Sequence, residues 1–163
     1  MQFTFEDLYN RLPNTLRYKL SKCLQDTIHH PEGSVENHTR MVFNEVVKNY
    51  NSDPDLLVAS IFHDLGKLDC IQIKIKDGVE RVGNVGHDHA SLKYIDEFYN
   101  RFKDVATSKE KIVEIVTHHM RIGSYVLGTM KKKGKREKME ANPYFQDIMN
   151  FYECDRKGRG STI

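Results

Sequence analysis

Histidine and aspartate are the side chains in this 163-residue sequence whose types and spacing suggest chemistry. His63 and Asp64 are adjacent, His38 precedes them, and Asp155 lies near the end of the sequence. Imidazole nitrogens and carboxylate oxygens together form a mixed ligand set that suits a divalent cation. An isolated His-Asp pair is more simply a surface pair, so the position of these residues relative to the apolar ones decides the interpretation.

The apolar spacing places these residues on the inward sides of predicted helices. His38 follows Val35 by three residues and precedes Val42 by four, and Asp155 follows Ile148 by seven. A buried carboxylate is costly unless it is paired or bound to a metal. One inward histidine would be an ordinary hydrogen-bonded core residue, whereas inward groups on three helices predict four ligands that converge on one ion.

The helices that would position these ligands are predicted from apolar spacing and from residues that start and stop helices. They cover residues 3–11, 14–25, 34 to about 50, 54–64, 89–102, 109–121 and 143–155. The predicted caps are Ser34, Ser52 or Asp53 before Pro54, Ser108, and Asn142 before Pro143, and the predicted stops are Gly66 and Gly158.

Residues 70–82 break the helical pattern. Ile71, Ile73 and Ile75 alternate with polar residues, and Asp77-Gly78 then turns the chain, which predicts a small β-hairpin. The sequence has no internal repeat, no low-complexity linker and no shift in composition. We therefore predict one all-α domain over residues 1–163, a helical bundle with a small β-hairpin at about 70–82.

The composition narrows the class of protein. Hydrophobic residues make up 39% and charged residues 29%, which excludes a mainly disordered chain and a membrane protein. The first five residues lack the basic and apolar regions of a signal peptide. Three cysteines without a Cys-x-x-Cys spacing fit a reducing compartment, so we expect a cytoplasmic protein without a membrane partner.

One segment carries most of the positive charge. Residues 131–138 hold six positive charges and one negative, so removing this +5 from the net charge of +2 leaves the rest of the chain at −3. A basic tract of this kind could meet phosphate groups, and a solvated loop is an equally good interpretation.

The order of motifs resembles a known family. His30-Pro31-Glu32-Gly33, His38-Thr39, Phe62-His63-Asp64-Leu65-Gly66-Lys67, Gly86-His87, His119-Met120-Arg121 and Asp155-Arg156-Lys157-Gly158-Arg159 follow one another in the sequence. This set resembles the HD-domain metal-dependent phosphohydrolases, and most of all the C-terminal HD domain of bacterial CCA-adding tRNA nucleotidyltransferases. The resemblance spans about residues 28–160. It includes no counterpart of the nucleotidyltransferase head, since Asp53-Pro54-Asp55 lacks a preceding Gly-rich turn and is typical of a helix start.

The resemblance implies that His38, His63, Asp64 and Asp155 hold a divalent metal ion, either a transition metal (Ni, Co, Mn, Zn or Fe) or Mg. One ion is expected and a second is possible, because some members of the wider superfamily add two histidines for a second metal or for phosphate. The candidates here are His87 and one of His118 and His119. Apolar periodicity favours His119 as the inward residue and His118 as the one at the rim.

The resemblance also implies a reaction, the attack of a metal-activated water on phosphorus. Asp64 could accept the proton of this water, and His87 or His119 could protonate the leaving group. The candidates for contact with phosphate are Lys67 and Arg121, with Arg156, Arg159 and His118 as weaker ones. The resembled domain acts on 2′,3′-cyclic phosphates, 2′-nucleotides and phosphate esters. We therefore expect a phosphomonoesterase or 2′,3′-cyclic phosphodiesterase that acts on nucleotides or RNA ends.

The remaining histidines have simpler interpretations. His30 either shapes the loop before His38 or lines the cleft, and His29 and His89 are expected to be ordinary surface residues. The basic tract at 131–138 lies between the helices of His119 and Asp155, so it could flank the cleft and hold an RNA backbone.

Three alternatives stay open at this point. Other HD proteins hydrolyse nucleoside monophosphates or triphosphates, which is the same reaction type on free nucleotides. The HD-fold di-iron oxygenases share the ligand order and need a six-ligand set, which this sequence could supply. A nucleic-acid-binding module with an incidental metal ion is the third.

Overall fold

Side-chain caps set the starts of several helices. The computed structural model describes residues 2–160, and in it Ser34 and Ser108 each accept a hydrogen bond from a main-chain N–H three residues ahead. Asp53 does the same for the helix that opens with Pro54, and Thr4 forms a reciprocal capping box with Asp7. The predicted caps Ser34, Asp53 and Ser108 are therefore confirmed.

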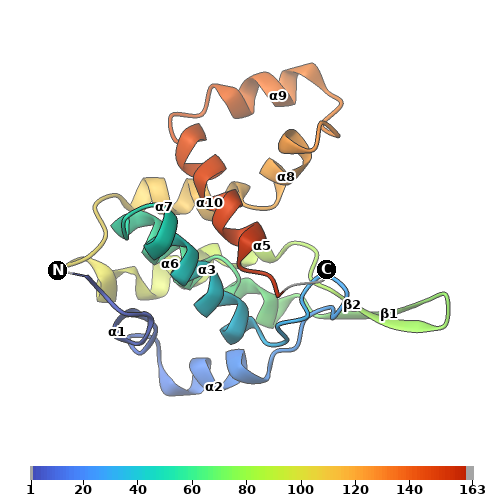
Figure 1. Ribbon diagram of the computed structural model, residues 1–163, viewed down its shortest axis with the longest axis horizontal. Coiled ribbons are helices and arrows are strands. Elements are labelled where there is room, and N and C mark those ends of the chain that lie inside the picture. The colour runs from blue at the N-terminus through green and yellow to red at the C-terminus, as the bar shows by residue number, and fades with distance from the viewer. Residues whose placement is uncertain (1, 161–163) are drawn as a thin grey trace.

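The described residues form a mainly helical fold with one antiparallel hairpin, as predicted (Figure 1). The elements are α1 (Phe5–Tyr9), α2 (Asn14–Lys22), α3 (Val35–Asn49), α4 (Pro54–Phe62), the 3₁₀-helix η1 (Leu65–Asp69), β1 (Gln72–Lys76), β2 (Val79–Gly83), α5 (His87–Ala90), α6 (Leu92–Phe98), the 3₁₀-helix η2 (Tyr99–Phe102), α7 (Lys109–His118), α8 (Arg121–Val126), α9 (Lys133–Glu140) and α10 (Phe145–Lys157). None of the helices in this part of the chain is long and apolar enough to cross a membrane.

Helix α4 lies at the centre of the core. Its residues from Asp55 to Phe62 are all buried, which is the pattern of a helix covered on every side. It packs against α3 and α7, and α10 packs against α3 and α7 in turn. The residues that directly follow α4 therefore emerge inside the protein, and the first two of these are His63 and Asp64.

The predicted hairpin is confirmed. Lys76 pairs with Val79, and the two residues between them, Asp77 and Gly78, both have positive φ angles of 54° and 76°. Positive φ at both positions is the requirement of the tight turn that matches the strand twist. The hairpin projects from the helices, and Ile75 is 79% exposed (Figure 1).

Two helices in the structure differ from the prediction in where they start or in how they are divided. The helix predicted at 89–102 begins at His87 and divides into α5, α6 and η2, with Ser91 at the first junction. The helix predicted from Pro143 begins at Phe145 instead, because Asn142 caps only the turn before it by accepting from the main chain of Tyr144. The predicted stop at Gly158 is confirmed as the end of α10.

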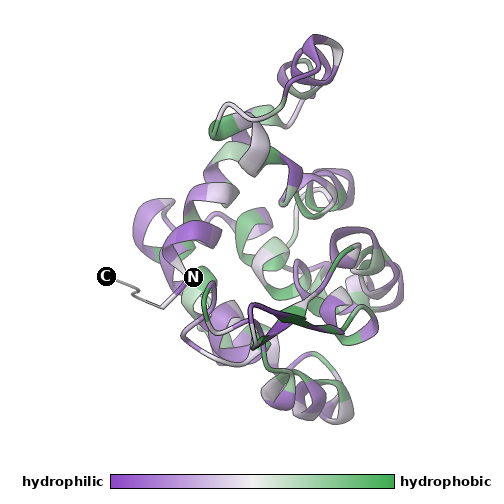
Figure 2. Ribbon diagram, turned by 90° about the vertical axis from the view of Figure 1, so that its right-hand side faces the viewer, coloured by the Kyte–Doolittle hydropathy of each residue, from purple (hydrophilic) through white to green (hydrophobic). Residues whose placement is uncertain are grey.

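Most of the basic tract is helical, because residues 133–138 lie in α9, whereas Lys131 and Lys132 precede this helix. Residues 133–140 are α9, which follows α8 after a short connection. Figure 1 shows α8 and α9 at one end of the molecule, and Figure 2 shows that α9 is strongly hydrophilic. We call residues 121–140 the α8–α9 arm.

Gly66 does not end α4, which stops four residues earlier. It lies inside η1, where a Cβ atom would clash with the carbonyl oxygen of His87 and lie 2.5 Å from the main-chain nitrogen of Ser91. The hydroxyl of Ser91 accepts a hydrogen bond from the Gly66 N–H and donates to the His63 carbonyl. The absence of a side chain at residue 66 therefore lets α5 approach the end of α4.

We expect Gly66→Ala to lower the free energy of unfolding by about 1–3 kcal/mol, because the clash is with main-chain atoms that cannot rotate away. Gly134→Ala is the matched control. Gly134 has no atom near its would-be Cβ and lies in α9, so its replacement should change stability by no more than about 1 kcal/mol, in the stabilising direction. Chemical denaturation of the two variants and the parent measures both values, and equal stabilities would refute the close-approach role.

Candidate metal centre

Six ionisable side chains from five places in the fold meet in the interior. His38 comes from α3, His63 and Asp64 follow α4, His87 opens α5, His119 follows α7, and Asp155 lies in α10. Each is at most 5% exposed. The structure thus brings together all six residues that were predicted as first or second metal ligands, and it places His119 inward, as the apolar periodicity predicted.

Four of the six surround one point. The Nε2 atom of His38 is 2.8 Å from Asp155 Oδ1 and 3.5 Å from Asp64 Oδ2. The Nε2 atom of His63 is 3.1 Å from Asp64 Oδ2 and 3.7 Å from Asp155 Oδ1. Ligand atoms about 2.0–2.2 Å from a shared ion lie roughly 3–3.5 Å from each other, so these separations fit a metal site.

A second group lies on the other side of the Asp64 carboxylate. Asp64 Oδ1 is 3.1 Å from His87 Nε2 and 3.5 Å from His119 Nε2, and the two histidine nitrogens are 3.1 Å apart. Asp64 therefore turns one oxygen to His38 and His63 and the other to His87 and His119. A carboxylate in this position could bridge two ions.

The main chain sets the orientation of all four imidazoles. Each Nδ1 lies 2.6–3.0 Å from a carbonyl oxygen, in the pairs His38 with Gly158, His63 with Ser60, His87 with Asn84, and His119 with Val116. A carbonyl only accepts, so each Nδ1 carries the hydrogen, and in the neutral ring the lone pair is on Nε2. This is the second-sphere arrangement that metal-ligating histidines use.

One inward-facing nitrogen of the cluster lacks a hydrogen-bond partner. His63 Nε2 is buried and makes no hydrogen bond with any residue from 2 to 160. Its neighbours are carboxylate oxygens and other imidazoles. An ionised carboxylate has no hydrogen to donate, and a neutral imidazole that donates through Nδ1 has none on Nε2. The cluster therefore needs positive charge at its centre, from bound protons or from a cation. A divalent metal ion fits this donor set.

The pKa values of the clustered side chains also indicate that the site favours positive charge. Burial opposes charge on Asp64 and Asp155, but neighbouring cations outweigh it and hold the pKa of both carboxyls well below the usual range. Burial also opposes a proton on His63, yet the nearby negative charges of Asp64 and Asp155 raise its pKa to about 10. Burial lowers the pKa of His119, and Asp64 offsets this only in part. Two buried anions thus attract whatever cation is available.

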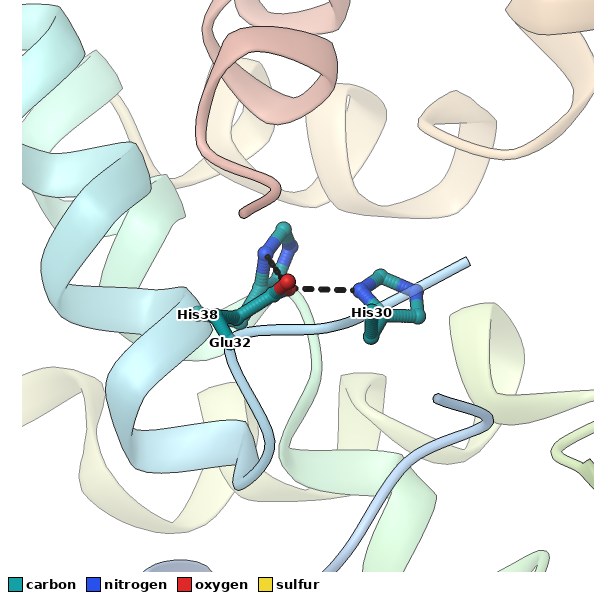
Figure 3. Close-up of side chains that lie close together, drawn as sticks. All are labelled: His30, Glu32 and His38. Atoms are coloured by element: carbon teal, nitrogen blue, oxygen red, sulfur yellow. Dashed lines mark hydrogen bonds and ion pairs between the residues drawn. The ribbon is translucent and has the colours of Figure 1, made fainter. Parts of the chain in front are cut away.

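Glu32 supports the cluster from behind. Its Oε1 atom is 2.8 Å from His30 Nδ1 and 3.0 Å from His38 Nδ1, and its Oε2 atom accepts from the main chain of Gly160 at 2.7 Å (Figure 3). Burial opposes its charge, but these hydrogen bonds dominate and lower the pKa of Glu32. The carboxylate therefore links the loop before α3, a metal-site histidine and the segment after α10.

Lys67 is fixed beside the same carboxylate. It is buried, its Nζ lies 3.3 Å from Asp64 Oδ2, and it donates to the side-chain oxygen of Gln25. Sequence reasoning did not assign roles to Gln25 or Glu32. Glu32 could have been found from its place in the His-Pro-Glu-Gly motif, whereas nothing in the sequence marks Gln25.

A cleft of about 670 Å³ opens next to the cluster, within the size range of small-ligand sites. Its lining includes His30, Lys67, His87, Arg121 and Arg159. We call it the metal-site cleft. The Nε atom of Arg159 is buried and has no hydrogen-bond partner among the described residues, so the guanidinium retains a donor for a ligand.

The other predicted phosphate contacts lie elsewhere. Arg156 is exposed and pairs with Glu153 at 3.0 Å, and it does not line the metal-site cleft. His118 points away from the cluster, with its Nε2 atom 3.1 Å from Glu114 Oε2. His30 both shapes the loop, through Glu32, and lines the cleft, so the two alternatives for this residue hold together. His29 and His89 are exposed, as predicted, and they also lie at the cleft.

The arrangement combines a buried His and Asp cluster, which could hold one or two metal ions, with a cleft whose walls carry Lys67, Arg121 and Arg159. Such a site could hold an anionic group against a cation. The sequence matches no protein-family model and no curated protein. What the cluster does is therefore inferred from its own geometry.

Proposed function

We propose that this chain is a divalent-metal-dependent phosphohydrolase of the HD-domain type that acts on nucleotides or RNA ends, as a phosphomonoesterase or 2′,3′-cyclic phosphodiesterase. One observation carries the proposal. Asp64 lies between two pairs of histidines whose Nε2 atoms converge on its two oxygens, beside a cleft lined by cations. The order of motifs that resembles HD phosphohydrolases supports it independently.

His38, His63, Asp64 and Asp155 would hold the first ion, and His87 and His119 would hold a second with the other oxygen of Asp64. A bound divalent ion lowers the pKa of water toward neutrality and polarises a phosphoryl oxygen. Burial lowers the pKa of His119, which favours the neutral form of the imidazole that a metal ligand needs.

The cations of the cleft would bind and orient the phosphate. Lys67 is already fixed between Asp64 and Gln25, so placing its ammonium group costs little further ordering. Arg121 and the unsatisfied Nε of Arg159 supply planar donors that match phosphate oxygens. Together they would neutralise the charge that spreads over the equatorial oxygens during phosphoryl transfer.

A second function shares the ligand set. The HD-fold di-iron oxygenases need six ligands, and the six buried side chains here come together in one cluster. The cations on the cleft wall favour a phosphate ester over an uncharged substrate, so we rank hydrolysis first.

A metal-by-substrate matrix tests the proposed reaction. Chelated protein should release no phosphate, and Mn²⁺, Ni²⁺ or Co²⁺ should restore hydrolysis of one or more of the 2′,3′-cyclic, 2′-, 3′- and 5′-phosphates of a nucleoside. Nucleoside triphosphates are included to detect the alternative hydrolases. The absence of turnover with every metal and substrate would contradict the proposal, and a mixed-valence optical signal with iron would point to the oxygenase.

Asp64→Ala should abolish metal-dependent phosphate release and weaken metal binding more than about 100-fold, because it removes the oxygens that both histidine pairs face. Asp96→Ala is the control, since Asp96 is exposed and its one ion pair among the described residues is with Lys109. Calorimetric titration with Mn²⁺ measures the affinity, and far-UV circular dichroism checks the fold. Unchanged activity in folded Asp64→Ala protein would refute the site.

Glu32→Gln should weaken metal binding by about 10–100-fold, because the carboxylate behind His38 makes its imidazole a stronger ligand. Glu36→Gln is the matched control, a neighbouring residue whose side chain bonds to Tyr9 instead. Equal metal affinity in the two variants would show that Glu32 only holds the loop. The thermal midpoint without metal separates a loss of stability from a loss of affinity.

A further inference from the structure

A second cavity lies beyond the metal-site cleft. Its volume is about 730 Å³, and it lies between α7 and the α8–α9 arm. Its lining includes His118, Arg121, Met130, Lys135, Lys138 and Met139. We call it the arm cavity. The metal centre makes no use of it, because none of the six clustered residues lines it.

The arm cavity and the metal-site cleft meet at Arg121, which lines both. The Nη2 atom of Arg121 is 3.1 Å from Nε2 of His89, another residue of the cleft. The chain reaches this point directly from the metal centre, because only Met120 separates His119 from Arg121. A ligand longer than one phosphate ester could therefore occupy both hollows at once.

The charges of the arm cavity are available for a ligand. Lys135 and Lys138 are three residues apart in α9, so they share a face of the helix, and neither forms an ion pair within residues 2–160. In the same tract Lys133 pairs with Glu137, and Arg136 donates to the carbonyls of Met130 and Lys131.

The only acid on the cavity wall within the described residues is Glu114. It is already occupied, since it accepts from Asn142 at 3.0 Å and lies 3.1 Å from His118 Nε2. Three cations, Arg121, Lys135 and Lys138, line the cavity against this one carboxylate, so the charge of the wall is net positive and favours an anion.

The wall of the arm cavity also contains apolar side chains and one nitrogen atom without a hydrogen-bond partner. Met139 is buried and Met130 half-buried, and both line the cavity. The Nδ1 atom of His118 is buried without a hydrogen-bond partner among the described residues. Free ammonium groups, an apolar wall and an unused imidazole nitrogen suit a ligand with phosphates, flat apolar groups and polar hydrogens. A strand of nucleic acid has all three, whereas an acidic peptide has no flat group at each step.

We propose that the arm cavity binds the nucleotide next to the reacting one, so that single-stranded RNA lies across Arg121 with its end in the metal-site cleft. This assignment of the reacting end rests on the proposed phosphohydrolase function, whereas RNA binding by the arm does not. Under this proposal, the substrate of the metal-site cleft is the end of an oligonucleotide. Because the ammonium groups of the cavity would contact phosphates and not base edges, binding tolerates many sequences and depends strongly on salt.

The test is fluorescence anisotropy with a labelled ten-nucleotide RNA that has a free 3′-hydroxyl. The full chain is titrated into this RNA in the presence of a metal chelator, so that binding is measured without hydrolysis. Lys135→Ala/Lys138→Ala should weaken binding by about tenfold and reduce the salt slope by about 1.4, the loss of two single-strand phosphate contacts. Lys131→Ala/Lys132→Ala is the control, because it removes the same charge from residues that do not line the cavity. It should change the affinity less than twofold.

Three outcomes would overturn the proposal: no binding by the parent chain, equal weakening in both double variants, or equally tight binding of a polyglutamate peptide. A hydrolysis assay with Mn²⁺ separates this proposal from the one it extends. Lys135→Ala/Lys138→Ala should lower kcat/KM for a phosphorylated oligonucleotide and leave that for a mononucleotide unchanged. If no substrate is hydrolysed but RNA binding still depends on the cavity lysines, the phosphohydrolase proposal fails and the arm site stands.

Discussion

The buried carboxylate of Asp64 is the constraint on which the rest of the structure depends. Taking a carboxylate out of water costs several kcal/mol unless groups around it repay the loss. The fold supplies them from every side, with His63 and Lys67 beside Asp64 in the chain and His38, His87 and His119 from three other elements. The apolar helix α4 forces this burial, because it is covered on all faces and delivers its last turn to the interior.

Close contacts between main-chain segments bring the residues that surround Asp64 into position. Gly66 admits α5, which carries His87, and Gly158 lies against Val42 of α3, so that its carbonyl can accept from His38. Glu32 joins the loop before α3 to Gly160. These contacts span up to 128 residues in sequence, so the geometry of the cluster is a property of the whole chain and not of any single motif.

The parts of the fold and of the cluster that could be predicted from the sequence are those set by residues close together in the chain. Apolar spacing placed His38, His119 and Asp155 inward, because a helix of known period fixes which side chains share a face. Capping residues and the Asp-Gly turn are equally local. Helix α9 escaped prediction because Met139 is its one buried residue, which leaves no apolar stripe to recognise. The roles of Gln25 and Gly66 depend on partners distant in sequence, so their residue types alone could not reveal them, whereas Glu32 is marked only by its place in the His-Pro-Glu-Gly motif.

Only Met120 separates His119 of the metal centre from Arg121, the first residue of the arm. The two parts are close in the chain but would control different properties of the site. Metal affinity would depend on buried groups whose orientation is set by carbonyls of the core, whereas the arm contributes exposed side chains on a helix with one buried residue. If the proposed function holds, changes in α9 would alter which phosphate esters reach the cleft and leave the candidate metal ligands in place. Arg121 belongs to both parts, since it starts α8 and lines both hollows. It is the residue at which substrate selection and phosphate binding would be coupled.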